Sequence, residues 1–176
     1  RNALLKRSVI DEAALDSFTG ELVKLGAEIT RLRRELAPRI SALARLAHRR
    51  ISNSTEELRL EYCSSVKSDF SIELAASLRR ERATRATLIG PHRDDLELLL
   101  DEHPAAQFGS EGQKRTLVTA LKMAQAEYLT GLHGSPPVLL IDDIMGELDV
   151  KRRSGLVPLL ERAHQAAIGA GFVHRH

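Results

Sequence analysis

A short apolar segment that ends in two aspartates is the feature that most constrains the fold. Residues 138–141 read Val-Leu-Leu-Ile, and Asp142 and Asp143 follow directly. A continuous apolar run of this length is typical of a strand that is buried on both faces of a parallel sheet. Because α/β folds bind ligands at the carboxyl ends of their strands, the two carboxylates mark a candidate site. The segment therefore predicts an α/β fold with an acidic site at the sheet edge.

The two aspartates are expected to have different roles, because successive side chains of extended backbone point in different directions. We expect Asp142 to hold the shell of a Mg²⁺ ion and Asp143 to polarise the water that attacks a phosphate. Hydrophobic strands that end in Asp-Asp also occur in other metal enzymes. The motif alone therefore leaves the reaction open.

An acidic turn follows three residues later. Residues 146–149 read Gly-Glu-Leu-Asp, and Lys-Arg-Arg at 151–153 opens a helix that we expect to reach about residue 165. The turn resembles the D-loop of ABC-type ATPases, which crosses the dimer interface beside the partner's nucleotide. Asp149 would be its acidic residue. The alternative is that Asp149 caps the following helix, and the two roles are compatible.

A second motif lies upstream, where Ser110, Glu111, Gly112 and Gln113 open a helix predicted to reach about residue 132. It resembles the ABC signature sequence Ser-Gly-Gly-Gln, with Glu111 in place of one glycine. A serine hydroxyl and free backbone N–H groups at a helix N-terminus suit a terminal phosphate, which in ABC-type dimers belongs to the ATP of the other subunit. The alternative is an ordinary serine cap. The order of signature, proline loop, strand and D-loop favours the ATPase interpretation.

The first third of the chain has a heptad pattern over residues 12–37. Its apolar positions alternate spacings of three and four: Leu15, Phe18, Leu22, Leu25, Ile29, Leu32 and Leu36. The pattern predicts a helix with an apolar seam. Pro38 and a change of phase predict a kink or short interruption near Pro38, then more helix to about residue 51. Two helices in a bundle and an antiparallel arm are both compatible with this pattern, and we expect a compact helical lobe.

Alternating residues predict a strand at 58–62, and the spacing of apolar residues predicts a helix over 68–85. Residues 87–89 and 96–100 are expected to form a strand pair around the turn at 90–94. We therefore divide the chain into a helical lobe, residues 1–86, and an ATPase subdomain, residues 87–176.

Composition limits the class of protein more than its activity. Of the 176 residues, 43% are hydrophobic and 3% aromatic, which predicts an ordered core built from aliphatic side chains. The single cysteine, Cys63, excludes an internal disulfide, and the apolar runs are too short to cross a bilayer, so we expect a cytoplasmic location and no membrane. Arginines cluster at 31–50 and 79–85, either as solvated helix faces or as a surface for a phosphate backbone.

Three motifs together resemble the RecF family of bacterial DNA-repair ATPases. They are Phe-Gly-Ser-Glu-Gly-Gln-Lys-Arg-Thr at 108–116, Gly-Pro-His-Arg-Asp-Asp-Leu at 90–96 and Pro-Val-Leu-Leu-Ile-Asp-Asp at 137–143. The double aspartate is itself RecF-like, whereas Gly146 departs from the family's usual serine. His92, Arg93 and Asp94 have two possible roles. They form a structural turn with an Arg–Asp pair, or they contact DNA or a nucleotide.

The resemblance implies the C-terminal half of an ABC-type P-loop ATPase head with an inserted helical lobe. It also implies ATP and Mg²⁺ as cofactors, an ATP-dependent homodimer, binding to single-stranded or gapped DNA, other recombination-mediator proteins as partners, and a role in repair and the SOS response. Alternatives are another SMC/ABC-type repair ATPase, and a non-catalytic interaction module that binds through the helices at 12–51. The intact Ser110, Gly112, Asp142, Asp143 and Asp149 argue against the module.

The chain contains no Gly-x-x-x-x-Gly-Lys-[Ser/Thr] phosphate loop. RecF-like proteins carry that loop before the point that matches Arg1. We therefore expect a slow ATPase in the parent protein, and neither tight ATP binding nor hydrolysis by these residues alone. His174 lies near the place of the γ-phosphate-sensing histidine in ABC-type proteins, but the residues around it do not match, so we exclude it from the site.

Overall fold

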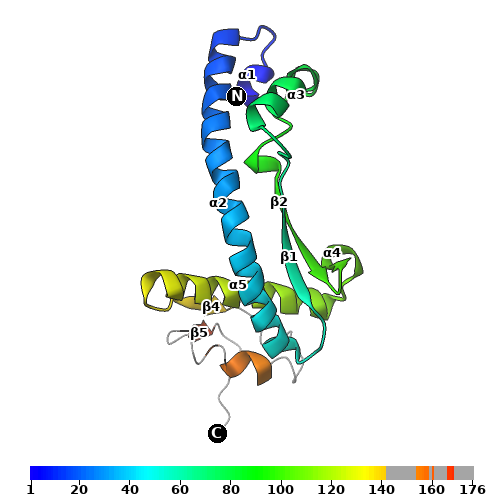
Figure 1. Ribbon diagram of the computed structural model, residues 1–176, viewed down its shortest axis with the longest axis vertical. Helices are drawn as coiled ribbons and strands as arrows, with labels where there is room; N and C mark the ends of the chain where they lie inside the picture. The colour runs from blue at the N-terminus through cyan, green and yellow to red at the C-terminus, as the bar shows by residue number, and fades with distance from the viewer. Residues whose placement is uncertain (142–153, 159, 161–165, 169–176) are drawn as a thin grey trace. The chain divides into compact units, whose positions relative to one another are not determined.

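The structure is a computed structural model that describes residues 1–141, 154–158, 160 and 166–168. The chain forms two compact units. The first joins Arg1–Leu36 to Tyr62–Leu96, and the second joins Ala37–Glu61 to Glu97–His176. Helix α2 (Glu12–Ser52) and strands β1 (Leu58–Cys63) and β2 (Asp95–Leu100) each contribute residues to both units (Figure 1). The mixture of helices and sheets confirms the predicted α/β class.

Helix α2 is one continuous element of 41 residues that contains Pro38. Of the predicted kink or short interruption near Pro38, the interruption is therefore absent. A proline inside a helix removes one backbone hydrogen bond and costs about 3 kcal/mol. Pro38 itself is exposed, whereas Ala37 and Ala44 on the neighbouring face are buried. Packing of that face offsets the cost, so the helix continues.

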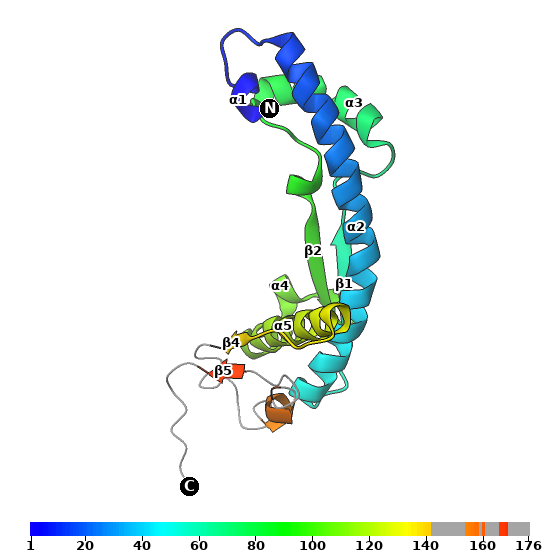
Figure 2. The same cartoon turned by 90° about the vertical axis from the view of Figure 1, so that its left-hand side faces the viewer.

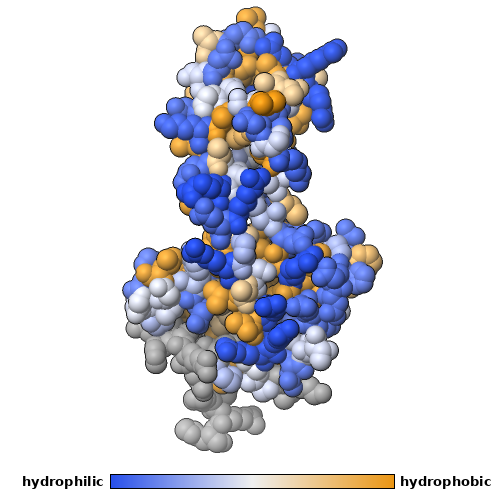
Figure 3. All heavy atoms as spheres, viewed as in Figure 1, coloured by the Kyte–Doolittle hydropathy of each residue, from blue (hydrophilic) through white to orange (hydrophobic). Residues whose placement is uncertain are grey.

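The large apolar side chains of the predicted seam point mostly outward. Phe18 is 55% exposed, Leu25 57% and Leu32 49%. The face that packs inside the first unit is narrower and carries smaller residues, including Gly26 and Thr30, which are buried. Apolar residues are accordingly visible on the surface of this unit (Figure 3). The heptad pattern predicted the helix correctly but not the face by which it packs.

The first unit has two small hydrophobic clusters. Leu4 and Leu5 of α1 (Asn2–Leu5) pack against Leu15, and Val66 packs with Phe70 and Leu74. The latter two belong to α3 (Phe70–Thr84), which lies beside α1 and the N-terminal part of α2 in both views (Figures 1 and 2). Helix α3 begins at a standard cap, since the Asp69 carboxylate accepts from the Ile72 N–H.

The predicted strand at 87–89 is absent, and β2 instead lies between β1 and β3. Side chains take the hydrogen bonds that a strand would make. The Asn2 side chain accepts from the Thr87 N–H, and Glu81 accepts from the Leu88 N–H. Glu81 is fully buried and also pairs with Arg1 at 2.6 Å. A buried ion pair thus organises this segment as a loop.

The second unit contains α4 (Ala105–Phe108), the long helix α5 (Glu111–His133) and two pieces of sheet. Strand β2 pairs antiparallel with β3 (His103–Pro104), matching Leu99 with Pro104. Strands β4 (Leu139–Ile141) and β5 (Ala166–Ile168) pair parallel. The helix predicted from residue 110, the loop before residue 138 and the strand after it are therefore confirmed.

The core of the second unit is formed where the C-terminal part of α2 crosses α5 (Figure 2). It consists of small and aliphatic residues: Ala44, Ala47, Ile51, Leu58, Leu100, Ala105, Leu117, Ala120, Met123, Ala124, Leu156 and Leu160. Residues 154–158 are helical and approach α2 closely, since a Cβ on Gly155 would lie 2.1 Å from the carbonyl oxygen of Arg50.

Two glycines of α2 test the packing of its small-residue face. A Cβ on Gly26 would lie 2.5 Å from the Phe70 ring, whereas a Cβ on Gly20 would meet nothing within 4 Å. We predict that Gly26→Ala lowers the free energy of unfolding by roughly 1–3 kcal/mol through overpacking. Gly20→Ala should raise it by up to about 1 kcal/mol, because alanine has the higher helix propensity. Urea unfolding of both variants measures this, and equal effects would contradict the packing described.

Candidate functional site

The signature motif lies at the start of α5, with Ser110 as its N-cap. The Ser110 hydroxyl oxygen accepts from the Gln113 N–H at 3.3 Å, and the Gln113 side-chain oxygen accepts from the Ser110 N–H at 2.8 Å. This reciprocal pair is a capping box. The serine cap that the sequence left as an alternative is therefore present.

A third residue holds the motif in place. The side-chain amide of Gln113 donates to a carboxylate oxygen of Glu56 at 2.6 Å. Nothing in the sequence indicates this contact, because the two residues lie 57 positions apart. Glu111, the departure from the usual signature, is exposed and pairs with Lys114 at 3.2 Å.

A capped helix start of this kind is still able to bind a phosphate. The cap uses the Gln113 N–H, which leaves the N–H groups of Glu111 and Gly112 without acceptors inside the helix. The Ser110 oxygen accepts one hydrogen bond in the cap, and its own proton remains available as a donor. Behind these groups lies the dipole of a helix of 23 residues. The donor set therefore fits the terminal phosphate of a nucleotide.

Strand β4 ends at Ile141, immediately before the two aspartates in the sequence. Asp142, Asp143, the D-loop residue Asp149 and His174 lie outside the described residues. Their predicted roles therefore stay predictions. Within the described ranges, no three His, Cys, Asp or Glu side chains are grouped closely enough to hold a metal ion. None of the described helices is long and apolar enough to span a bilayer.

The motif at 90–96 belongs to the first unit, where Asp94 is its central residue. The Asp94 side chain is only 1% exposed. One carboxylate oxygen accepts from both the backbone N–H of Ser65, at 2.7 Å, and its hydroxyl, at 2.8 Å. The other accepts from the Tyr62 hydroxyl and lies 3.7 Å from the Arg33 guanidinium. Asp94 therefore joins three segments of the unit.

The neighbours of Asp94 have separate contacts. The Arg93 guanidinium donates to the backbone oxygen of Thr87 at 3.1 Å, and a His92 ring nitrogen lies 3.2 Å from the same oxygen. Arg33 donates to the backbone oxygen of Pro91 at 2.6 Å. The ion pair of Asp94 is thus with Arg33 and not with Arg93. These contacts support a structural role for Asp94, one of the two that the sequence left open.

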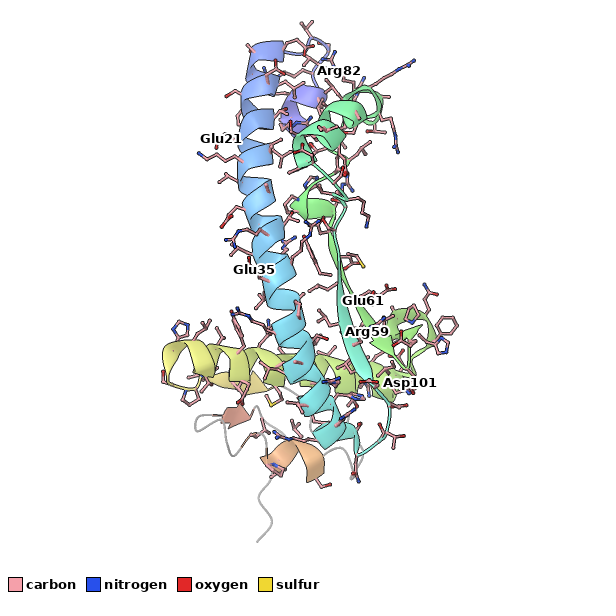
Figure 4. The ribbon with its side chains drawn as sticks, in the orientation of Figure 1. Glu21, Glu35, Arg59, Glu61, Arg82 and Asp101 are labelled. Carbon is pink, nitrogen blue, oxygen red and sulfur yellow. The ribbon has the colours of Figure 1, made fainter. Side chains whose placement is uncertain are left out.

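The two arginine clusters differ in how their charges are used. Arg31 pairs with Glu28 and Glu35 at 2.7 and 2.6 Å, and most of the other α2 arginines also contact carboxylates or backbone oxygens. On α3, Arg82 pairs with Glu12 (Figure 4). Three further exposed arginines have no ion pair within the part of the chain that the structure describes: Arg79, Arg80 and Arg85. Arg39 and Arg50 of α2 are likewise exposed without an ion pair among the described residues, so both helices present some unpaired positive charge.

The environment of Asp94 predicts a pH-dependent stability. Burial raises the pKa of Asp94, but the hydrogen bonds from Tyr62 and Ser65 and the charge of Arg33 outweigh it, so the pKa lies below its ordinary value. A carboxylate with a depressed folded-state pKa stabilises the fold above its unfolded-state pKa, and the contribution is lost as the pH falls through the folded-state pKa. Asp94→Asn should lower the free energy of unfolding at pH 7 by about 1–3 kcal/mol.

Chemical denaturation between pH 7 and pH 2.5 measures the free energy of unfolding of the variant and of the unsubstituted protein. The difference between the two proteins should become smaller as the pH falls. The matched control is Asp95→Asn, since the Asp95 side chain is exposed and accepts only from the N–H of Leu96 among its described contacts. An equal loss in both variants, or a loss that does not depend on pH, would contradict the role given to Asp94.

Known proteins with similar sequences are RecF proteins. No family model matches the chain. The DNA replication and repair protein RecF of Cyanothece sp. (strain PCC 7425) is 35% identical over 96% of the chain, and that of Symbiobacterium thermophilum is 37% identical over 96%. Each match covers 48% of the relative, so the chain spans about half the length of the curated relatives it matches.

Solved structures give the same result. The structure of the recombination mediator protein RecF with ATP matches 99% of the chain and 50% of its own, with a TM-score of 0.81 and 29% identity. A second structure, of RecF-ATPrS in the RecFOR pathway, matches 97% of the chain and 49% of its own, with a TM-score of 0.81 and 30% identity. The sequence and the fold thus agree: nearly the whole chain is similar to RecF proteins, and it corresponds to about half of their length.

Proposed function

We propose that this chain supplies half of the nucleotide machinery of a RecF-type DNA-repair ATPase. The observation that carries the proposal is the start of α5, where Ser110 caps the helix and the N–H groups of Glu111 and Gly112 have no acceptor inside it, a donor set that fits a phosphate. That surface stands in the same unit as β4, the strand that leads into Asp142 and Asp143. The solved RecF structures with ATP support this interpretation.

In the proposed dimer the two motifs serve different nucleotides. Ser110, Gly112 and Gln113 contact the terminal phosphate of the ATP held by the partner subunit. Asp142 holds Mg²⁺ and Asp143 polarises the attacking water at the subunit's own ATP, while Asp149 lies in the D-loop at the interface. Binding of ATP then brings two subunits together, and hydrolysis separates them. We also propose that the chain has two functional parts, a helical lobe at residues 1–86 and an ATPase subdomain at residues 87–176.

We further propose that the dimer acts on single-stranded or gapped DNA in the cytoplasm, together with other recombination-mediator proteins, in repair and the SOS response. The names of the relatives support repair, replication and recombination. The exposed arginines of α3 support contact with a phosphate backbone, because they are not neutralised by neighbouring carboxylates within the described residues. The paired arginines of α2 are less suited to it.

The role of the signature serine is tested in full-length RecF protein that contains these residues. Ser110→Gly keeps a good N-cap, at a cost of a few tenths of a kcal/mol, but removes the hydroxyl that would contact phosphate. We predict that it weakens dimerisation with a non-hydrolysable ATP analogue at least about tenfold, the value of one hydrogen bond to a charged group. Binding of ATP to the monomer should not change.

Two further variants complete this test. Asp143→Asn should still dimerise but lose ATP turnover by about a hundredfold or more. Ser135→Ala, a change in an exposed loop serine, should behave as the unsubstituted protein. Analytical ultracentrifugation and steady-state ATPase assays measure both properties. Failure of the unsubstituted protein to dimerise with the analogue would contradict the proposed function.

The DNA surface gives a separate prediction. Replacing both Arg79 and Arg80 with Gln should weaken DNA binding equally for different sequences. Because each lost charge lowers the slope of log K against log salt by about 0.9 for duplex DNA, the slope should fall by about 1.8. Arg31→Gln, which removes a cation already paired with Glu28 and Glu35, should change the slope much less. Fluorescence anisotropy between 50 and 300 mM salt measures the slopes, and equal slopes for the two variants would place the DNA surface elsewhere.

A further inference from the structure

Glu56 is connected to the signature motif in a way that neither the sequence motifs nor the comparisons indicate. It is half-buried, and it precedes β1 in the segment between α2 and the sheet. One of its carboxylate oxygens accepts from the Gln113 amide at 2.6 Å, a short contact of the kind that a charged acceptor makes. The other lies 3.2 Å from the Ser54 hydroxyl, which donates to it or to Ser52.

The contact fixes which way the Gln113 amide points. A glutamine side chain has one acceptor end and one donor end, and either end can face a given neighbour. The Glu56 carboxylate accepts hydrogen bonds and donates none, so it requires the NH₂ end. The oxygen end is then directed at the Ser110 N–H, where it accepts at 2.8 Å and completes the capping box. The orientation of Ser110 thus depends on a carboxylate outside the motif.

The hydrogen bonds continue to the end of α2. The Ser54 hydroxyl lies 3.0 Å from the hydroxyl of Ser52, the last residue of that helix, and the Ser54 N–H donates to the same oxygen at 3.3 Å. Ser52, Ser54, Glu56, Gln113 and Ser110 therefore form an unbroken series within the second unit. The signature cap is coupled to the helix end through polar contacts as well as through the shared apolar core.

We propose that Glu56 is a positioning residue for the signature motif, holding Gln113 and through it Ser110 in the arrangement that receives the phosphate of the partner's nucleotide. The expected effect on dimerisation rests on the proposed function, whereas the contacts among Glu56, Gln113 and Ser110 do not. Glu56 acts through Gln113 and does not contact the nucleotide. Its removal is therefore expected to impair dimerisation and to leave binding of ATP to a subunit's own site intact.

The experiment compares Glu56→Ala with Glu57→Ala in full-length RecF protein containing these residues. Glu57 is the matched control, because it is the neighbouring residue and carries the same charge. Its side chain is 55% exposed and pairs with Arg45, not with Gln113. Glu56→Ala should raise the protein concentration at half-dimerisation with the ATP analogue about tenfold, as expected for one lost charged hydrogen bond. Glu57→Ala should leave it unchanged, and monomer ATP affinity should be the same in both.

Two further variants distinguish positioning from a general loss of structure. Glu56→Gln keeps an acceptor without the charge and should restore most of the dimerisation. In a Gln113→Ala background, Glu56→Ala should have no additional effect, because its proposed action passes through Gln113. A full additional loss in that background, or equal behaviour of the Glu56 and Glu57 variants, would overturn the proposal.

Hydrogen exchange on the same proteins, measured without nucleotide, tests the arrangement independently of dimerisation. Glu56→Ala should accelerate exchange of the Ser110 N–H, which loses its oriented acceptor, while the middle of α5 stays protected. If the unsubstituted protein fails to dimerise, the proposed function fails, and the exchange result still decides the role of Glu56. Unchanged exchange at Ser110 would refute that role.

Discussion

The packing of α2, whose buried face includes several small residues, is the constraint on which both units depend. Gly26 and Thr30 are buried in the first unit, and Ala44 and Ala47 are buried in the second. Small side chains let neighbouring elements approach the helix backbone closely, as the distance from Gly26 to the Phe70 ring shows. Helix α2 is continuous past Pro38 and has buried residues on both sides of that proline.

Buried charged side chains help to define the structure of the first unit, which has few buried hydrophobic side chains. Its clusters contain few buried hydrophobic residues, and two carboxylates, Glu81 and Asp94, are almost fully buried beside them. Each has several donors, so the cost of removing it from water is met by hydrogen bonds as well as by an arginine. Such groups need not increase stability relative to an apolar core. They do hold the segments at 64–66 and 86–94 through specific contacts, since Asp94 accepts from Ser65 and Glu81 accepts from the Leu88 N–H.

Local sequence signals predicted the elements that depend on local contacts. The serine and glutamine three positions apart predicted the start of α5, and the apolar run at 138–141 predicted β4. The failures share one cause, which is that distant side chains decide the outcome. Residues 87–89 resemble a strand, but Asn2 and Glu81 take their backbone groups. Helix α2 packs against the cluster of Phe70 and Leu74 through Leu22 and Val23, while Phe18 and Leu25 are exposed. The link from Glu56 to Gln113 spans 57 positions. Of the candidate site, the sequence could supply the motif residues but not what holds them.

The signature helix also shows why a structural cap and a phosphate site are compatible at one serine. A cap uses the lone pairs of the hydroxyl oxygen, whereas a phosphate accepts the hydroxyl proton and the backbone N–H groups of the first turn. The cap therefore sets the direction of the donors without consuming them. An anion is nevertheless opposed by Glu111 at the first helical position, and Lys114 pairs with that carboxylate at 3.2 Å. Glu56 is likewise engaged by the Gln113 amide, which stands between it and Ser110. Both of these acidic groups are thus occupied by a donor, and the positive end of the α5 dipole is left to face an incoming phosphate.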